Sequence, residues 1–181
     1  LEYQSLPDFW ERLSTKQAIG AMALRFTILT VARLGEVRLA TWNEFDLAAG
    51  VWTIPASRMK AEREHVVPLS SAAVEIVRHL HEHRTGDIVF PGTRRGKPLS
   101  DMTLTKTLRD MKVVNAKGEP VTVHGFRSTF FDWARNETDF SRELIEESLA
   151  HSLGKVEAAY RRGAAIERRR QLMETWQNLV I

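Results

Sequence analysis

The stretch AIGAMALRFTILTVARLG, residues 18–35, decides how the rest of the chain must fold. It is apolar on nearly every face of a helix. These apolar side chains are Ile19, Met22, Leu24, Phe26, Ile28, Leu29 and Val31. A helix without a polar face is buried, so we expect this one to run through the middle of a domain. Arg25 and Arg33 interrupt the run, which favours a buried helix over a membrane span. The preceding STKQ, residues 14–17, predicts a capping box at its start.

After this helix, the spacing of apolar and turn residues predicts a small antiparallel sheet and several further helices. Runs typical of strands lie at 45–47, 51–54 and 65–69, and a long charged loop, 55–64, joins the last two. DIVFPG, residues 87–92, is compatible with another short strand. Helical spacing and caps predict helices at 36–40, 70–85, 100–111, from 124, at 141–150, around 160 and through 173–180. The fold class is therefore α+β, mainly α.

The composition bounds the class of protein. The 181 residues suffice for one packed domain, and a net charge of +3 does not by itself demonstrate a polyanionic partner. Without cysteine there is neither a disulfide framework nor a thiolate metal site, which fits a reducing compartment. No signal-peptide pattern is present. Because the chain begins at Leu1 and not Met, we expect a fragment of a longer protein.

Two helix ends carry residues suited to binding an anion. Arg33 and Glu36 are three residues apart and share a helix face. Arg33 ends an apolar helix, where a cation is costly unless a carboxylate or phosphate pairs with it. His124 and Arg127 have the same spacing at an expected helix start, which favours phosphate. The alternatives are a surface salt bridge for the first pair and a helix-entry histidine for the second, and taken alone each pair is better explained by its alternative.

Two further pieces are a loop lysine and a basic C-terminal segment. Lys60 lies at the tip of the 55–64 loop, where a lone lysine is usually a solvated charge. Residues 155–170 carry six positive and two negative side chains, a local charge of 6 − 2 = +4. Tyr160 lies within this segment. A tyrosine with a pKa of about 10 reacts only if a base or cations assist it, so a buried ring and a reactive hydroxyl both remain open.

Signals for metals and cofactors are weak. Of His79, His81 and His83, only the first and last share a helix face, so a solvated helix is favoured over a metal site. The sequence has no phosphate-cradling glycine loop, no dinucleotide fingerprint and no Gly-x-Ser-x-Gly elbow. We therefore expect no metal and no cofactor.

The order and content of these pieces resemble the catalytic domain of tyrosine recombinases, and most of all the integrases of prophages and genomic islands. The resemblance spans roughly residues 15–176. Three segments carry it: WTIPASRMKAEREHVVPLS (52–70), VHGFRSTFFDWARNE (123–137) and LAHSLGKVEAAYRR (149–162). One departure is Val31, at a position where the family usually has glycine. The resemblance implies that residues 1–181 are a single catalytic domain, separated from the N-terminal DNA-binding domains of the full-length protein.

The resemblance also implies a set of site residues. The catalytic set is Arg33, Lys60, His124, Arg127, His151 and the nucleophile Tyr160, with Glu36 in support. The candidates for DNA contact are His65, Arg94, Arg95, Lys97, Arg161 and Arg162. The implied reaction is site-specific cleavage and rejoining of DNA through a 3′-phosphotyrosyl intermediate, without metal or ATP. The mobile 55–64 hairpin would bring Lys60 into place only with DNA bound.

The implied partner is double-stranded attachment-site DNA, in a bacterial, cytoplasmic and nucleoid-associated setting without a membrane. On DNA, a homotetramer of the full-length protein with DNA-bending accessory proteins is expected, while the fragment alone is expected to be monomeric. Three alternatives remain: a type IB topoisomerase-like relaxation activity, a non-catalytic DNA-binding remnant and a histidine metalloprotein. The last helix is compatible with packing on its own domain or on a neighbouring subunit.

Overall fold

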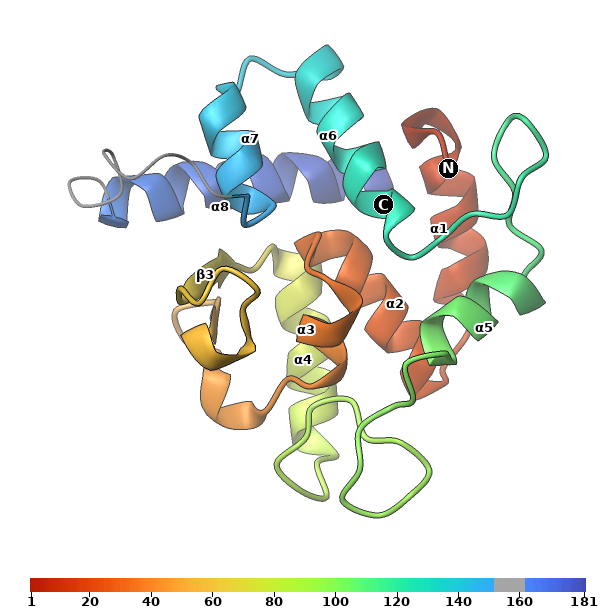
Figure 1. The fold of residues 1–181 in the computed structure, drawn as a ribbon, viewed down its shortest axis with the longest axis vertical. Coiled ribbons are helices and arrows are strands. Elements are labelled where there is room, and N and C mark those ends of the chain that lie inside the picture. The colour runs from red at the N-terminus through yellow and green to blue at the C-terminus, as the bar shows by residue number, and fades with distance from the viewer. Residues whose placement is uncertain (152–161) are drawn as a thin grey trace.

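The helix predicted from residues 18–35 is the centre of the molecule. The computed structural model describes residues 1–151 and 162–181, and α2 (Ile19–Thr30) lies in their middle (Figure 1). Helices α1 (Leu6–Ser14), α3 (Leu34–Arg38), α4 (Ser71–Glu82), α5 (Thr103–Asp110) and α8 (Arg162–Val180) all pack against it. Burial on all sides explains why its sequence carries no polar face.

A three-stranded antiparallel sheet flanks α2 in the order β1 (Phe45–Asp46), β2 (Val51–Ile54) and β3 (His65–Pro68). Trp52 and Ile54 on β2 are fully buried, and the Trp52 ring lies 5.5 Å from that of Phe26 on α2. The three predicted strands are confirmed to within one residue at each end. Residues 87–92 form only isolated bridges, such as Thr41 with Ile88, and not a strand.

The second half of the chain wraps around this centre. Helix α6 (Gly125–Glu137) and helix α7 (Arg142–Ser148) lie above α2 and α3 in Figure 1, and α8 passes behind them. Short 3-10 helices lie at η1 (Tyr3–Ser5), η2 (Trp42–Glu44) and η3 (Ala56–Arg58). The expectation of a mainly helical α+β fold with a small antiparallel sheet is confirmed.

The C-terminal helix α8 packs on its own chain. The Trp176 side chain is fully buried, with ring centroids 5.3 Å from Phe130 and 5.0 Å from Trp133 on α6. Its Nε1 donates a hydrogen bond of 2.8 Å to the backbone oxygen of Ile28 on α2. Residues 162–181 therefore pack on their own chain in this structure, which is one of the two arrangements compatible with the sequence.

The predicted capping box at residues 14–17 is wrong. Ser14 is the last residue of α1, which has proline in its first turn and buries four residues: Leu6, Phe9, Trp10 and Leu13. Their i, i+3, i+4, i+7 spacing gives α1 a core-facing side. Helix α2 begins only at Ile19, with Ala18 as its N-cap residue. The helix expected around residue 160 lies outside the described residues.

Candidate active site

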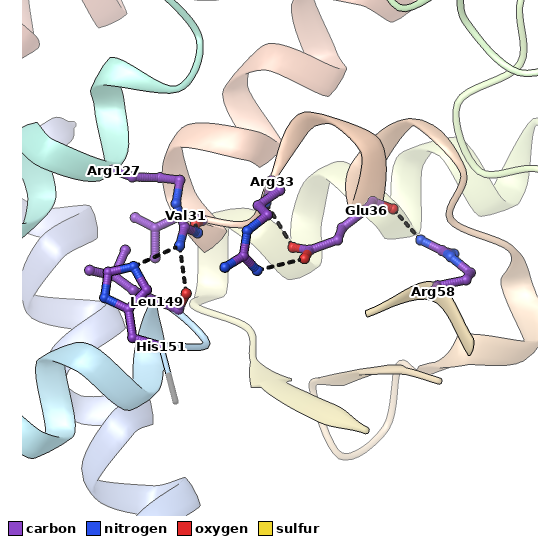
Figure 2. A network of polar contacts seen from close by, with 7 residues as sticks. All are labelled: Val31, Arg33, Glu36, Arg58, Arg127, Leu149 and His151. Carbon is purple, nitrogen blue, oxygen red and sulfur yellow. Dashed lines mark hydrogen bonds and ion pairs between the residues drawn. The ribbon is translucent and has the colours of Figure 1, made fainter. Parts of the chain in front are cut away.

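The first arginine of the site stands where α2 ends and α3 begins. Val31, directly after α2, has a left-handed backbone with φ of 49°, which turns the chain so that Arg33 becomes the N-cap residue of α3. Glu36, buried on the first turn of α3, accepts hydrogen bonds from the Arg33 backbone N–H (2.8 Å) and from its Nη1 (2.9 Å). The Arg33 side chain therefore has a fixed direction, as Figure 2 shows.

Arg127, on the first turn of α6, is the second arginine. Its side chain is buried, with Nη1 donating to the backbone oxygen of Val31 and Nη2 donating to that of Leu149 at 2.5 Å. Figure 2 shows the guanidinium between these two carbonyls. Burial and the nearby Arg33 guanidinium lower the pKa of Arg127 to about 10, so that it still carries its charge at neutral pH.

The end of α7 places His151 against Arg127. The N–H of His151 donates to the Glu146 oxygen (3.0 Å) and the N–H of Ala150 donates to the Glu147 oxygen (2.9 Å), while Ala150 has φ of 51°. These are the two bonds of a Schellman motif, with Ala150 at the left-handed position. The His151 Nε2 lies 3.4 Å from Arg127 Nη2. Desolvation, Arg127 and Arg33 lower the pKa of His151 and favour a neutral ring.

Arg33 and His151 line a common cleft of about 380 Å³. Its lining residues are Arg33, Met59, Lys60, Ala61, Ala150 and His151. Lys60 is exposed and reaches this cleft from the 55–64 loop, while Met59 beside it is buried. Three segments that are far apart in the sequence therefore meet at one cleft, and the segment 59–61 brings the expected Lys60 to it.

Two expected histidines lie near this centre. His124 is the N-cap residue of α6 and is exposed, three positions before Arg127. His65, the first residue of β3, is half-buried. Burial and the charges of Arg169, Arg33 and Arg127 lower the pKa of His65 to about 3, so its ring is neutral at pH 7.

Three of the other expected DNA contacts, Arg94, Arg95 and Lys97, do not join this centre. These three residues are exposed on the turn between Pro91 and Pro98, which lies below α3 in Figure 1, away from α6 and α7. The nucleophile candidate Tyr160 and the neighbouring Arg161 lie outside the described residues. Arg162 is the first residue of α8, and its side chain also lies outside the described part of the chain.

Sequence reasoning missed two arginines that hold the site's surroundings together. Arg58 donates to Glu44 Oε1 (2.5 Å), to the Leu39 oxygen (2.8 Å) and to the Glu36 oxygen. Arg169, on α8, is 3% exposed and donates to the Val66 oxygen of β3 at 2.5 Å. For Arg58 the available signal was its place two residues before Lys60. For Arg169 the sequence offered no such signal, because this residue lies within the run of three arginines at 168–170.

The described residues, 1–151 and 162–181, contain no group of three or more His, Asp or Glu side chains placed to hold a metal ion. No helix within these ranges is long and apolar enough to cross a membrane.

The fold is that of known recombinases. It matches the crystal structure of XerA recombinase with a TM-score of 0.62 at 16% identity, over 92% of this chain and 56% of that one. It also matches a lambda integrase(75–356) dimer bound to a COC′ core site, with a TM-score of 0.61 at 19% identity, over 87% and 61% of the two chains.

Residues 1–165 match the sequence model of the phage integrase family, and the chain belongs to that family. It is 35% identical to prophage integrase IntA of Escherichia coli K12 over 84% of this chain and 37% of that protein. It is 34% identical to the integrase of Enterobacteria phage P4 over 94% of this chain and 42% of that protein. The chain thus spans less than half the length of these relatives. The expected membership among tyrosine recombinases is confirmed.

Proposed function

We propose that this chain is the catalytic part, residues 1–181, of a site-specific DNA strand-exchange enzyme. The observation that carries the proposal is the meeting of Arg33, Arg127 and His151 at one site, in a chain of the phage integrase family. The proposed substrate is double-stranded attachment-site DNA. The proposed reaction integrates or excises a prophage or genomic island.

The cationic groups would stabilise the transition state. Attack on a phosphodiester adds negative charge to the non-bridging oxygens, and planar guanidinium groups match that geometry. Arg33 is held for this role by Glu36. A guanidinium has five N–H donors, so Arg127 keeps donors for a phosphate beyond those used by Val31 and Leu149. Neutral His151 would supply a further hydrogen bond.

The covalent step would use Tyr160, which lies outside the described residues. Its phenolic oxygen attacks phosphorus, the bond from phosphorus to the 5′-oxygen breaks, and a 3′-phosphotyrosyl link remains. His124 accepts the phenolic proton and Lys60 gives a proton to the departing 5′-oxygen. A second 5′-hydroxyl reverses the step. The link keeps the energy of the phosphodiester, so we propose that neither ATP nor a metal is required.

We further propose that the full-length protein acts as a homotetramer on DNA, with DNA-bending accessory proteins, in the bacterial nucleoid. Exposed Arg94, Arg95 and Lys97, together with Arg161 and Arg162, are proposed to contact the DNA backbone. His65, close to the site arginines, is proposed as a further substrate contact.

A nicked suicide duplex tests the proposal. The duplex carries the junction sequence from the end of the element that encodes the chain, and covalent protein–DNA adducts are counted on a denaturing gel with EDTA present. Wild-type protein should form the adduct, and Tyr160→Phe should form none. No wild-type adduct, or equal adduct with phenylalanine, contradicts the proposal. Relaxation of any supercoiled plasmid without strand exchange would favour the topoisomerase-like alternative.

A further inference from the structure

Arg58, whose side chain is 18% exposed, lies at the root of the loop that carries Lys60. The loop leaves β2 at Pro55 and passes through η3, whose last residue is Arg58. Met59, next along, is 6% exposed, whereas residues 60–64 are all exposed. Lys60 is therefore the first residue beyond a fixed anchor, inside a turn closed by the hydrogen bond from the Glu62 N–H to the Met59 oxygen (3.0 Å).

The guanidinium of Arg58 ties this root to the helix that holds Arg33. It donates to the backbone oxygen of Glu36 on α3 and to that of Leu39 directly after α3. Figure 2 shows Glu36 linked on one side to Arg33 and on the other to Arg58. Glu36 thus connects two arginines, through its carboxylate to Arg33 and through its carbonyl to Arg58.

A third acceptor makes the anchor rigid. Glu44, whose side chain is 6% exposed, binds Arg58 Nη1 with one carboxylate oxygen and Trp52 Nε1 with the other (2.8 Å). Fully buried Trp52 lies on β2, so the ion pair fixes the loop root to the sheet as well as to α3. Charge-assisted bonds to three acceptors restrict both the position and the rotation of a guanidinium.

We propose that Arg58 is a positioning residue for Lys60: it sets the distance between the loop that carries the lysine and the Arg33 side of the cleft. The inference rests on the proposed function, in which Lys60 protonates the leaving 5′-oxygen. Arg58 itself does not line the cleft. Its loss should therefore slow only the part of the reaction that needs the lysine.

A change of leaving group separates this role from a general structural one. A 5′-sulfur in place of the 5′-oxygen at the scissile phosphate leaves as a thiolate, and thiols have a pKa of about 8.5, so no proton donor is needed. Single-turnover cleavage is measured with protein in excess on two nicked duplexes that differ only in this atom. The thiolate duplex thus reports attack and charge stabilisation without the lysine.

The main variant pairs Arg58→Met with Glu44→Gln. It removes both charges together, so no buried carboxylate is left without its partner, and the glutamine oxygen still accepts from Trp52. Lys60→Ala is the reference for a missing proton donor. Arg12→Met is the matched control, because Arg12 also donates to a backbone oxygen, that of Met111, but lies on α1.

We expect the double variant to cleave the oxygen duplex about 10- to 100-fold more slowly than wild type, as for a displaced general acid. On the sulfur duplex it should be within about 3-fold of wild type, as should Lys60→Ala, because no proton is transferred. Arg12→Met should match wild type on both duplexes.

Two results would overturn the inference while the proposed function stands. One is a double variant as fast as wild type on the oxygen duplex. The other is a double variant slowed equally on both duplexes while sulfur restores Lys60→Ala. A wild-type protein that cleaves neither duplex, or a Lys60→Ala protein that sulfur does not restore, counts instead against the proposed function or its proton donor.

Discussion

At the scale of single residues, Ala150 is the one on which the position of His151 directly depends. Its φ of 51° costs an L-residue roughly 1–2 kcal/mol, whereas glycine adopts it freely. Glycine also loses about 0.5–1 kcal/mol more conformational entropy on folding than alanine. We therefore expect Ala150→Gly to raise the free energy of unfolding by about 0.5–1 kcal/mol in urea denaturation.

Two glycines provide controls for this prediction. Gly118 has φ of 77° and Gly86 has no positive φ, and both have open space where a Cβ would stand. Gly118→Ala should lower the free energy of unfolding, and Gly86→Ala should raise it by about 0.4–1 kcal/mol. An Ala150→Gly protein that is clearly less stable than wild type would show that the left-handed turn carries no strain.

Val31 shows how far sequence reasoning reaches at this scale. The sequence places a valine where the family usually has glycine, and the φ of 49° gives the physical reason for that preference. The spacing of Arg33 with Glu36 predicts their contact, because both lie on one turn. It does not predict the partners of Arg127, since the carbonyls of Val31 and Leu149 are 96 and 22 residues away.

At the scale of elements, the end of α2 is completed by side chains from other helices. The last four carbonyls of a helix have no partner within it. Trp176 of α8 donates to the Ile28 oxygen, and Arg127 of α6 donates to the oxygen of Val31 just beyond the helix. The central helix is therefore closed by residues that lie about 100 to 150 positions later in the chain.

This arrangement predicts a cost for Trp176→Phe. The substitution keeps an aromatic ring but removes the only N–H of the indole, which leaves the Ile28 oxygen buried without that donor. We expect the free energy of unfolding to fall by about 2–4 kcal/mol, from the lost partner and the smaller ring together. The measurement is urea denaturation followed by circular dichroism.

Trp42→Phe is the matched control. The Trp42 Nε1 is buried without a hydrogen-bond partner among the described residues, so its removal leaves no acceptor unpaired. We expect that variant to lose less than about 1 kcal/mol. Equal losses in the two variants would mean that ring volume, and not the hydrogen bond to α2, determines the cost.

Periodicity predicts most elements of this chain but not which face a charge occupies. Strands β2 and β3 and helix α6 follow from short, regular patterns. The run 168–170 counts as a basic patch in the sequence, yet Arg169 is buried against β3 and Arg170 donates to the backbone oxygens of Gly50 and Leu69. Only the packing of α8 determines that two of these three charges serve the fold.

At the scale of the whole molecule, positive charge is concentrated although the net charge is only +3. Arg33, Arg127 and Arg169 come from three distant parts of the chain, and all three lower the pKa of His65. Composition cannot reveal this, because it depends on how α3, α6 and α8 meet. The concentration suits a phosphate and makes any further proton at this place unfavourable.

The acid stability of the molecule should therefore depend on His65. Its pKa is about 3 in the folded state and about 6.5 when unfolded, so between these values the unfolded state binds more protons. Folding stability from this group is complete above pH 6.5 and is lost as the pH falls toward 3. When the pH is lowered from 6.5 to 4.5, we expect the free energy of unfolding of His65→Gln to fall by roughly 1–2 kcal/mol less than that of wild type. The measurement is urea denaturation at each pH. Carboxylate titration is common to both proteins and cancels in the difference.

His83→Gln, which removes an exposed histidine at the end of α4, should follow the wild-type curve. If His65→Gln also follows that curve, the three arginines do not act on His65 as their placement indicates.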